Sequence, residues 1–372
     1  MSLENIREAS QSIDSVFLRS PQFVSAELSD RLSRETVIKV ETFNPIKSFK
    51  GRGADYFMHQ VPSGRTVVCA SAGNFGQAIA YAGSARGVSV RVFAAATANT
   101  AKVARLRELG AQVVLEGRDF DAAKIVARDY VRLHPECLFV EDGHEARISE
   151  GAGTIAVELD RMHMDALLVP VGNGALISGI GRWMKARNPQ TKIIGICAQR
   201  APAMALSWRE GRPVNGQTTA TMADGIAVRV PVPAAVDWMK EYVDDMVLVS
   251  EESIWRALEV VRDTLGLLVE PSGAVGIAAA LEYGRNGSSL GTIITGGNLS
   301  AELFARLTGG AGSGPGWLAG EEQAVPGVGE KMVVAFWARQ DCVTSRCGRP
   351  RMTGRPSGTT GCTPSSVRRG RT

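Results

Sequence analysis

Short β-branched runs alternate with longer amphipathic runs through most of the chain, and this alternation is the feature that most restricts its fold. From residue 65 to residue 133, three strand-like and three helix-like segments take turns, at 65–70, 74–86, 88–95, 99–109, 111–117 and 120–133. Strands of period two separated by helical runs predict a parallel sheet that is covered by helices.

A second series shows the same alternation. Its helix-like segments are 154–162, a run that ends at Asn188 and Pro189, 253–265 and 273–283, and its extended segments are 165–171, 192–198, 267–270 and 291–295. Both halves are therefore predicted to be α/β, with open parallel or mixed sheets and helices on both faces. In such folds ligands bind beyond the carboxyl ends of the strands, so we expect one crevice that the two halves share.

The charge distribution excludes broad classes of partner. The 372 residues include 42 Lys and Arg against 38 Asp and Glu, but residues 309–372 hold nine of the basic and four of the acidic residues. Residues 1–308 are left with 33 basic and 34 acidic side chains. This balance offers no electrostatic basis for binding nucleic acid or an anionic membrane. We expect small, neutral or zwitterionic partners.

Cysteine and histidine are not spaced as metal ligands. The six cysteines form no Cys-x-x-Cys pair and the four histidines are scattered, so no metal site is expected. The first fifteen residues carry acidic side chains and no apolar core, and no apolar run reaches the length of about 18 residues that spans a membrane. The sequence thus predicts a cytoplasmic protein with reduced thiols.

The composition changes after Leu307. Residues 309–372 contain 13 glycines, are rich in Arg, Ser, Thr and Pro, and show an apolar run only at 332–338. Such a segment cannot bury much core, so we expect a disordered extension rather than a regulatory module.

Three glycine-bearing loops follow expected strands, at 71–77, 172–179 and 295–298. The amides at a helix N-terminus bind phosphate or carboxylate, and glycine permits close approach. A dinucleotide-binding loop would need glycine where Ile177 stands, and a P-loop would need lysine where Ile180 stands. What remains is a site for one isolated phosphate, together with a lysine elsewhere that forms a covalent link to an aldehyde.

Lys50 is the candidate lysine, because it lies between Phe49 and glycine in the segment FNPIKSFKGRGA. This segment resembles the cofactor-lysine motif of the fold-type II pyridoxal-phosphate enzymes, the tryptophan-synthase-β-like family, and most closely its threonine and serine dehydratase branch. The resemblance spans roughly residues 20–307 and continues, in order, through SAGNFGQAIAYA, EGAGTIAVEL, PVGNGALISGIG, IIGICAQRAPAM, TMADGIAVR, VEPSGAVGIAAA and ITGGN. Several motifs in compatible order are more specific than any one of them.

The resemblance implies two domains and one cofactor site. A large cofactor-binding domain would comprise residues 1–52 and 151–308, and a small domain that binds the substrate carboxylate would comprise residues 53–150. Lys50 would carry pyridoxal 5'-phosphate as a Schiff base and act as the catalytic residue. The other cofactor contacts implied are Phe49 beside the ring, Asn74 at the ring hydroxyl, Gly172, Asn173, Gly174, Ala175 and Leu176 around the phosphate, and Thr295 at the pyridine nitrogen. Those implied for the substrate are Ser71, Ala72, Gly73, Asn74 and Phe75, at the positive end of a helix.

The hydroxyl of Thr295 bears on the type of reaction. Unlike a carboxylate, a hydroxyl does not favour a protonated pyridine nitrogen, so the ring would be a weaker electron sink and prompt loss of a β-substituent would be favoured over transamination. We hypothesise that Lys50 removes the Cα proton and that the β-hydroxyl leaves with a proton from the cofactor phosphate. Hydrolysis of the product would give a 2-oxo acid and ammonia, the lyase reaction of a threonine or serine dehydratase.

Four features depart from the dehydratase pattern. Phe75 stands where histidine is usual, the run EDG at 141–143 replaces a Phe-Asp segment, and Ala152 replaces glutamine. In the family these positions lie near the substrate side chain, so threonine is not assured as the substrate. Cys197 stands where relatives with a cation site have a carboxylate, so we expect no required divalent ion.

Two alternatives stay open. The chain could add a nucleophile after elimination, as a β-replacement enzyme of specialised amino-acid metabolism does, or it could bind the cofactor without catalysis, which the retention of Lys50 disfavours. Ala72 matches the position at which the serine-racemase branch has a proton-donating serine, so elimination is expected to exceed racemisation. The resemblance also implies a homo-oligomer, a dimer or a tetramer.

Overall fold

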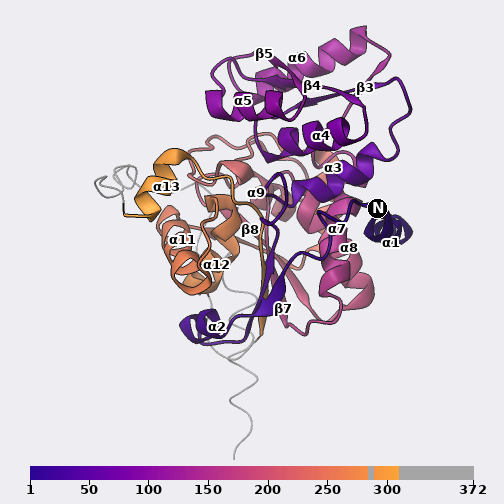
Figure 1. The fold of residues 1–372 in the computed structure, drawn as a ribbon. Coiled ribbons are helices and arrows are strands. Elements are labelled where there is room, and N and C mark those ends of the chain that lie inside the picture. The colour runs from indigo at the N-terminus through magenta and orange to yellow at the C-terminus, as the bar shows by residue number, and fades with distance from the viewer. Residues whose placement is uncertain (284–288, 310–372) are drawn as a thin grey trace, which may run out of the picture.

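The computed structural model describes residues 1–283 and 289–309. It has two sheets, one of six strands and one of four, and Figure 1 shows them in separate lobes, the smaller above the larger. The predicted α/β class, with helices on both faces of open sheets, is confirmed. The expected disordered extension lies outside the described residues, apart from Gly309.

The small lobe is a fully parallel sheet with strand order β5-β4-β3-β6. Its strands are β3 (Thr66–Ala70), β4 (Ser89–Ala94), β5 (Gln112–Leu115) and β6 (Cys137–Phe139), and its helices are α4 (Asn74–Ala85), α5 (Thr100–Glu108) and α6 (Phe120–Leu133). Alternate residues of β3 face opposite sides: Val67 packs with α4, and Val68 packs with α6. Because helices cover both faces of the sheet, side chains on both sides of the strand are buried, and the strand reads as a continuous apolar run.

The large lobe has strand order β1-β2-β10-β7-β8-β9, and only β1 is antiparallel to its neighbour. Its strands are β1 (Gln22–Val24), β2 (Thr36–Val40), β7 (Ala166–Pro170), β8 (Lys192–Ala198), β9 (Asp245–Val249) and β10 (Leu290–Ile294). The central strands are buried along their whole length, as expected for a parallel sheet covered on both faces.

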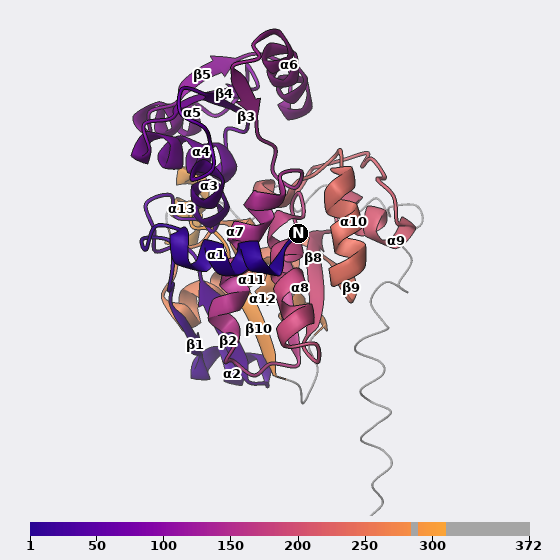
Figure 2. The ribbon, with the colours of Figure 1, turned by 90° about the vertical axis from the view of Figure 1, so that its right-hand side faces the viewer.

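Helices cover both faces of the large sheet. The helix α2 (Ala26–Leu32) packs on one face with α11 (Glu251–Leu265) and α12 (Pro271–Tyr283), and α7 (Ala146–Leu159), α8 (Ala175–Arg187) and α10 (Pro233–Tyr242) pack on the other. Three shorter elements, α9 (Ala203–Glu210), the 3-10 helix Asp224–Ile226 and α13 (Ala301–Leu307), complete the lobe. Figure 2 shows α1 (Leu3–Ser12) crossing this lobe beside α7.

One helix joins the lobes. The helix α3 (Lys50–Met58) contacts α4 of the small lobe and α7 of the large one, and it spans the boundary that we expected at residues 52 and 53. The domain limits therefore stay a proposal.

Several elements differ from the sequence-based expectation. The helix predicted at 154–162 begins eight residues earlier, at Ala146, although Gly151 and Gly153 disfavour helix locally. Tight packing explains the two glycines, because a Cβ on Gly151 would lie 2.7 Å from the carbonyl oxygen of Arg52. The segment 267–270, which was expected to be extended, is a loop outside both sheets, and strands β1, β2, β6 and β9 were not predicted.

In the described part of the chain, every helix is too short or too polar to cross a lipid bilayer.

Candidate active site

The carboxyl edges of the two sheets face one cleft of about 1410 Å³. The loops after β3, β6, β7 and β10 all line it, as does the segment 45–50 that precedes α3. Parallel strands deliver their following loops to the same edge, so segments more than 200 residues apart in sequence meet at one place. The shared crevice that the sequence predicted is present.

Lys50 is the first residue of helix α3 and follows a loop that is joined to the loop after β10 by backbone hydrogen bonds. The amide of Phe49 donates to the carbonyl of Thr295 over 3.1 Å, and the amide of Gly297 donates to the carbonyl of Lys47 over 2.9 Å. Ser48 and Gly296 form an isolated antiparallel bridge. These backbone bonds fix the position from which the lysine side chain enters the cleft.

The loop at 172–176 has the geometry of an anion site. Gly174 adopts φ +90° and is followed by Ala175, the first residue of the 13-residue helix α8. The amides in the first turn of a helix have no partner within the helix, and the helix dipole favours an anion there. All five residues of the loop, Gly172, Asn173, Gly174, Ala175 and Leu176, line the cleft.

Asn74 is held by two partners that the sequence analysis did not single out. Its side-chain amide donates to Glu270 Oε1 over 2.8 Å, and its Oδ1 accepts from Asn298 Nδ2 over 2.8 Å. The backbone amide of Asn298 also donates to Glu270 Oε2, over 3.2 Å. Glu270 and Asn298 belong to the motifs VEPSGA and ITGGN. Their place in these two motifs is the feature of the sequence that could have identified them as site residues.

Glu270 is buried, and burial raises its pKa to about 7. The negative charge of Asp224 acts in the same direction, while the hydrogen bonds from Asn74 and Asn298 and the charge of Lys102 oppose the shift. A carboxyl in such a position ionises near neutral pH instead of near pH 4, roughly its ordinary value.

Two hydroxyls lie near each other at the base of the cleft. Thr295 is 4% exposed, and its hydroxyl makes a long bond of 3.4 Å to the carbonyl of Ser272. The hydroxyl of Ser272 is buried and has no partner among the described residues. Both residues line the cleft, so both have hydrogen-bonding capacity to offer a ligand.

The loop 71–75 leads into helix α4. Ser71 Oγ accepts from the amide of Gly73 over 3.2 Å, and the N-terminal turn of α4 opens onto the cleft with Asn74 and Phe75. Ala72 is half-buried and also lines the cleft. The residues predicted for the substrate carboxylate are therefore together at a helix N-terminus.

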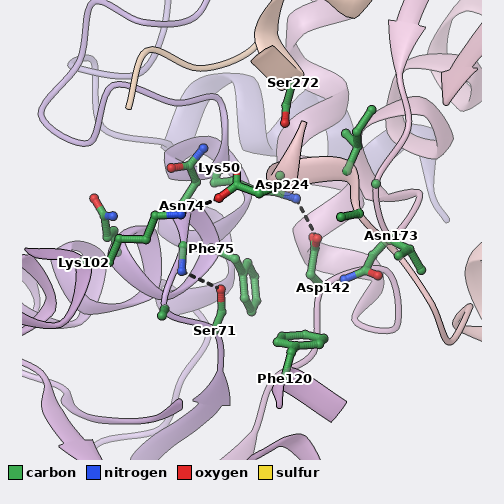
Figure 3. A pocket seen from close by; sticks show the side chains of 18 of the residues that line it. Lys50, Ser71, Asn74, Phe75, Lys102, Phe120, Asp142, Asn173, Asp224 and Ser272 are labelled. Carbon is green, nitrogen blue, oxygen red and sulfur yellow. Dashed lines mark hydrogen bonds and ion pairs between the residues drawn. The ribbon is translucent and has the colours of Figure 1, made fainter. Parts of the chain in front are cut away.

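Asp142 is the residue that contacts Lys50 most directly. The Lys50 Nζ lies 2.6 Å from Asp142 Oδ2, and Figure 3 shows the pair in the pocket with Phe75 and Phe120 nearby. Gly143 follows at φ +83°, where a Cβ would lie 2.2 Å from the carbonyl oxygen of Asn173. The close approach of these two backbones explains the glycine in the EDG run and brings Asp142 beside the 172–176 loop.

The other positions at which the sequence departs from the dehydratase pattern do not all lie at the cleft. Phe75 and Glu141 line the cleft, whereas Ala152 is not among the lining residues and is buried in the core with α8. Cys197 is buried, and burial raises the pKa of its thiol to about 12, so it would be a poor metal ligand. No group of three or more potential ligands is placed to hold a metal within residues 1–283 and 289–309; the expectation of no required divalent ion stays a prediction.

Ion pairs bridge the mouth of the cleft between the lobes. Lys102 of α5 pairs with Asp224, and Arg229 pairs with Asp121 of α6 over 2.5 Å. These side chains are partly exposed, so each pair contributes about 1 kcal/mol or less.

Comparison with known proteins decides the family. The model of the family described as "Pyridoxal-phosphate dependent enzyme" matches residues 16–296. The chain belongs to this family.

Individual relatives agree with the assignment. The chain is 35% identical to an L-threonine ammonia-lyase of Thermotoga maritima over 315 residues, which are 82% of this chain and 78% of that protein. It superimposes on threonine deaminase isoform 2 of Solanum lycopersicum with a TM-score of 0.76 and 31% identity, covering 84% of this chain and 95% of the other. Maize serine racemase gives a TM-score of 0.77 at 26% identity, with 82% and 96% covered. Lyase and racemase structures thus share this fold.

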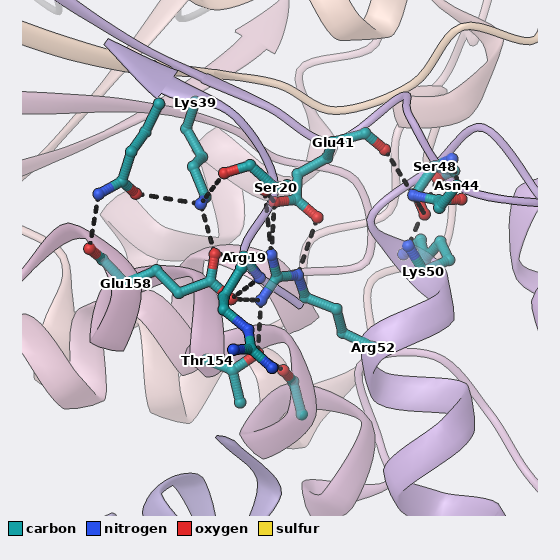
Figure 4. Close-up of polar contacts among 12 residues, drawn as sticks. Arg19, Ser20, Lys39, Glu41, Asn44, Ser48, Lys50, Arg52, Thr154 and Glu158 are labelled. Carbon is teal, nitrogen blue, oxygen red and sulfur yellow. Dashed lines mark hydrogen bonds and ion pairs between the residues drawn. The ribbon is translucent and has the colours of Figure 1, made fainter. Parts of the chain in front are cut away.

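In this pyridoxal-phosphate enzyme, a buried network of ion pairs anchors α3, the helix that begins with Lys50. Arg52, two residues along α3, is fully buried and bonds both oxygens of Glu41, each over 2.8 Å, and Glu158 Oε1 over 2.6 Å. Lys39 pairs with the same Glu158 (Figure 4). Burial would lower the pKa of Arg52, but the two carboxylates overcome this effect and raise it. The network joins α3 to β2 and α7.

We expect Arg52→Ala to lower the free energy of unfolding by about 3–5 kcal/mol, because it leaves the Glu41 and Glu158 carboxylates buried or half-buried without their main partner. Urea denaturation followed by circular dichroism measures the change. The matched control is Arg132→Ala, which removes an exposed arginine of α6 and should change stability by less than about 0.5 kcal/mol. Equal stabilities of the two variants would contradict the anchoring role.

We expect Glu270 to make stability fall as pH rises. Between about pH 4.5 and 7 the unfolded chain loses this proton while the folded protein keeps it, so the stability of the wild type relative to Glu270→Gln decreases across that window, by on the order of 3 kcal/mol in total. Unfolding free energies at pH 5 and pH 8 measure it. Glu108→Gln, at an exposed position, should show no such dependence, and parallel pH profiles for both variants would refute the assignment.

Proposed function

We propose that this enzyme is a lyase that removes the β-hydroxyl and the amino group of an amino acid such as L-threonine or L-serine, giving a 2-oxo acid and ammonia. The observation that carries the proposal is the meeting, in one cleft, of the Lys50 amine, the anion-binding loop 172–176 and the buried Thr295 hydroxyl. The names of the relatives, threonine ammonia-lyase and threonine deaminase, support the same reaction.

The residues of the cleft fit pyridoxal 5'-phosphate. Residues 172–176 would hold the phosphate, Asn74 the ring hydroxyl and Thr295 the pyridine nitrogen, with Phe49 beside the ring. The spare hydrogen-bonding capacity of the buried Ser272 and Thr295 hydroxyls is what a polar ring edge would use. When bound, the cofactor withdraws electrons and acidifies the Cα–H bond of the amino acid attached to it.

The protein's own groups account for binding and proton removal. Ser71 and the first amides of α4 would hold the substrate carboxylate, because a helix N-terminus stabilises an anion. Lys50, whose amine lies 6.0 Å from the centre of the Phe75 ring, would accept the Cα proton as general base. Thr295 presents a hydroxyl rather than a carboxylate, which supports elimination over transamination.

We also infer that the enzyme works as a cytoplasmic homo-oligomer. Cys69, Cys137 and Cys197 are free thiols, which is consistent with a reducing compartment. The family resemblance supports a dimer or a tetramer, and light scattering of the purified protein measures which one forms.

We expect Lys50→Ala to abolish both the visible absorbance of the bound cofactor and ammonia release, because the covalent link and the base are one nitrogen. The assay is a panel of threonine, serine and 3-hydroxyaspartate, each with and without an added thiol, which also detects β-replacement. Lys192→Ala, at a half-exposed position on β8, is the control and should behave as the wild type. Turnover by Lys50→Ala at the wild-type rate would remove the central claim.

We expect the wild type to form at most a trace of D-serine from L-serine relative to 2-oxo acid. Racemisation needs a second proton donor on the opposite face of Cα, and the methyl group of Ala72 cannot supply a proton. His144 is exposed and lies outside the residues that line the cleft. Chiral chromatography measures the ratio of the two products.

Ala72→Ser should raise D-serine formation, whereas Ala95→Ser, which adds a hydroxyl elsewhere on the cleft wall, should not. Comparable racemase and lyase rates in the wild-type enzyme would defeat this interpretation.

A further inference from the structure

The amine of Lys50 has a carboxylate partner in a largely buried part of the cleft. Asp142 Oδ2 lies 2.6 Å from Nζ, and the two side chains are 8% and 14% exposed. The rings of Phe49 and Phe75 stand 4.6 Å and 6.0 Å from the same nitrogen, measured to their centroids. A charge-assisted hydrogen bond is strong in such surroundings, and a proton moves readily along it.

The second oxygen of Asp142 accepts no hydrogen bond from the described residues. Asp142 Oδ1 is buried and has no hydrogen-bond partner in the described ranges, although its residue lines the cleft. An unmet carboxylate oxygen costs free energy when it is buried. The Asp142 side chain therefore has one oxygen bonded to Lys50 and spare hydrogen-bonding capacity on the other.

The other carboxylates of the cleft are already engaged. Within the described residues, Asp119 and Asp121 contact Arg229, Glu141 contacts Lys124 and Arg128, Asp224 contacts Lys102, and Glu270 contacts Asn74. Each of these carboxylates therefore has a partner other than Lys50. Asp142 differs because its partner is the lysine proposed as the base.

The elimination needs an acid as well as a base. Hydroxide is a poor leaving group, so the β-oxygen must gain a proton as its bond to carbon breaks. Lys50 gains a proton when it removes the one on Cα. The hydrogen bond to Asp142 offers that proton a direct path away from Lys50.

We propose that Asp142 relays the proton from Lys50 to the departing β-oxygen. The Cα–H electrons form the new carbon–carbon double bond, the proton passes from Cα to Lys50 and then to the Asp142 carboxylate, and Asp142 delivers it to the oxygen. The carbon–oxygen bond breaks with its electron pair on oxygen, and water leaves. Lys50 and Asp142 return to their starting protonation states. The relay rests on the proposed lyase function and takes the role first ascribed to the cofactor phosphate.

The test compares two leaving groups in the holoenzyme. L-Serine needs a proton on its leaving oxygen, whereas 3-chloro-L-alanine loses chloride, which needs none. We expect Asp142→Asn to lower kcat/KM for serine by about 10²–10⁴-fold, the usual contribution of a general acid, and to lower kcat/KM for 3-chloroalanine less than about tenfold. Asp129→Asn, an exposed change on α6, is the matched control and should leave the ratio of the two rates unaltered.

Two readouts separate the relay from damage to the site. Titration of the cofactor into Asp142→Asn, followed by its absorbance, should give binding close to that of the wild type. Exchange of the Cα hydrogen of L-alanine for deuterium, followed by NMR, should persist, because this exchange uses Lys50 as base and has no leaving group. If Asp142→Asn does not fold or bind the cofactor, Asp142→Ala and Asp142→Glu carry the same comparison, and Glu should restore part of the serine activity.

The outcomes are distinct. A selective loss on serine supports the relay. Equal losses on both substrates would show that Asp142 only positions Lys50, and retention of serine activity would show that the proton comes from another group; either result overturns the relay. A wild-type enzyme that eliminates chloride but turns over no β-hydroxy amino acid would instead refute the proposed function.

Discussion

The fully buried guanidinium of Arg52 requires opposite charges around it, and its partners determine where the helix that carries Lys50 lies. A buried charge without compensation would cost several kcal/mol, and here Glu41 follows β2 while Glu158 belongs to α7. Their pairing fixes helix α3 against the large lobe. Lys50, at the first residue of the same helix, therefore starts from a backbone that the core holds in place.

The two sides of the cleft differ in how firmly they are tied. The lysine loop and the loop after β10 share backbone hydrogen bonds between Phe49 and Thr295, so the proposed cofactor side is continuous with the large sheet. The loop 71–75 comes from the small lobe and meets the large lobe through the bonds of Asn74 with Glu270 and Asn298. Helices α5 and α6 reach the large lobe through exposed ion pairs, which are individually weak. Backbone hydrogen bonds thus hold the lysine side of the cleft, whereas side-chain contacts hold the side that comes from the small lobe.

Two carboxyl groups and one hydroxyl set the chemistry of the cleft in different ways. Glu270, with a pKa raised to about 7 by burial, carries less negative charge at neutral pH than an exposed glutamate does. Thr295 contributes a neutral hydroxyl, while Asp142 places its carboxylate beside the Lys50 amine.

The sequence by itself determined the fold class, because the alternation of strands and helices is local and periodic, and it indicated candidate site residues, because Lys50, Asn74, 172–176 and Thr295 lie in recognisable motifs and all line the cleft. The tertiary structure alone decided the rest. The early start of α7 depends on close backbone packing at Gly151, and the partnership of Lys50 with Asp142 joins residues 92 positions apart. No local pattern specifies such contacts, since they exist only once two sheets bring their carboxyl edges together.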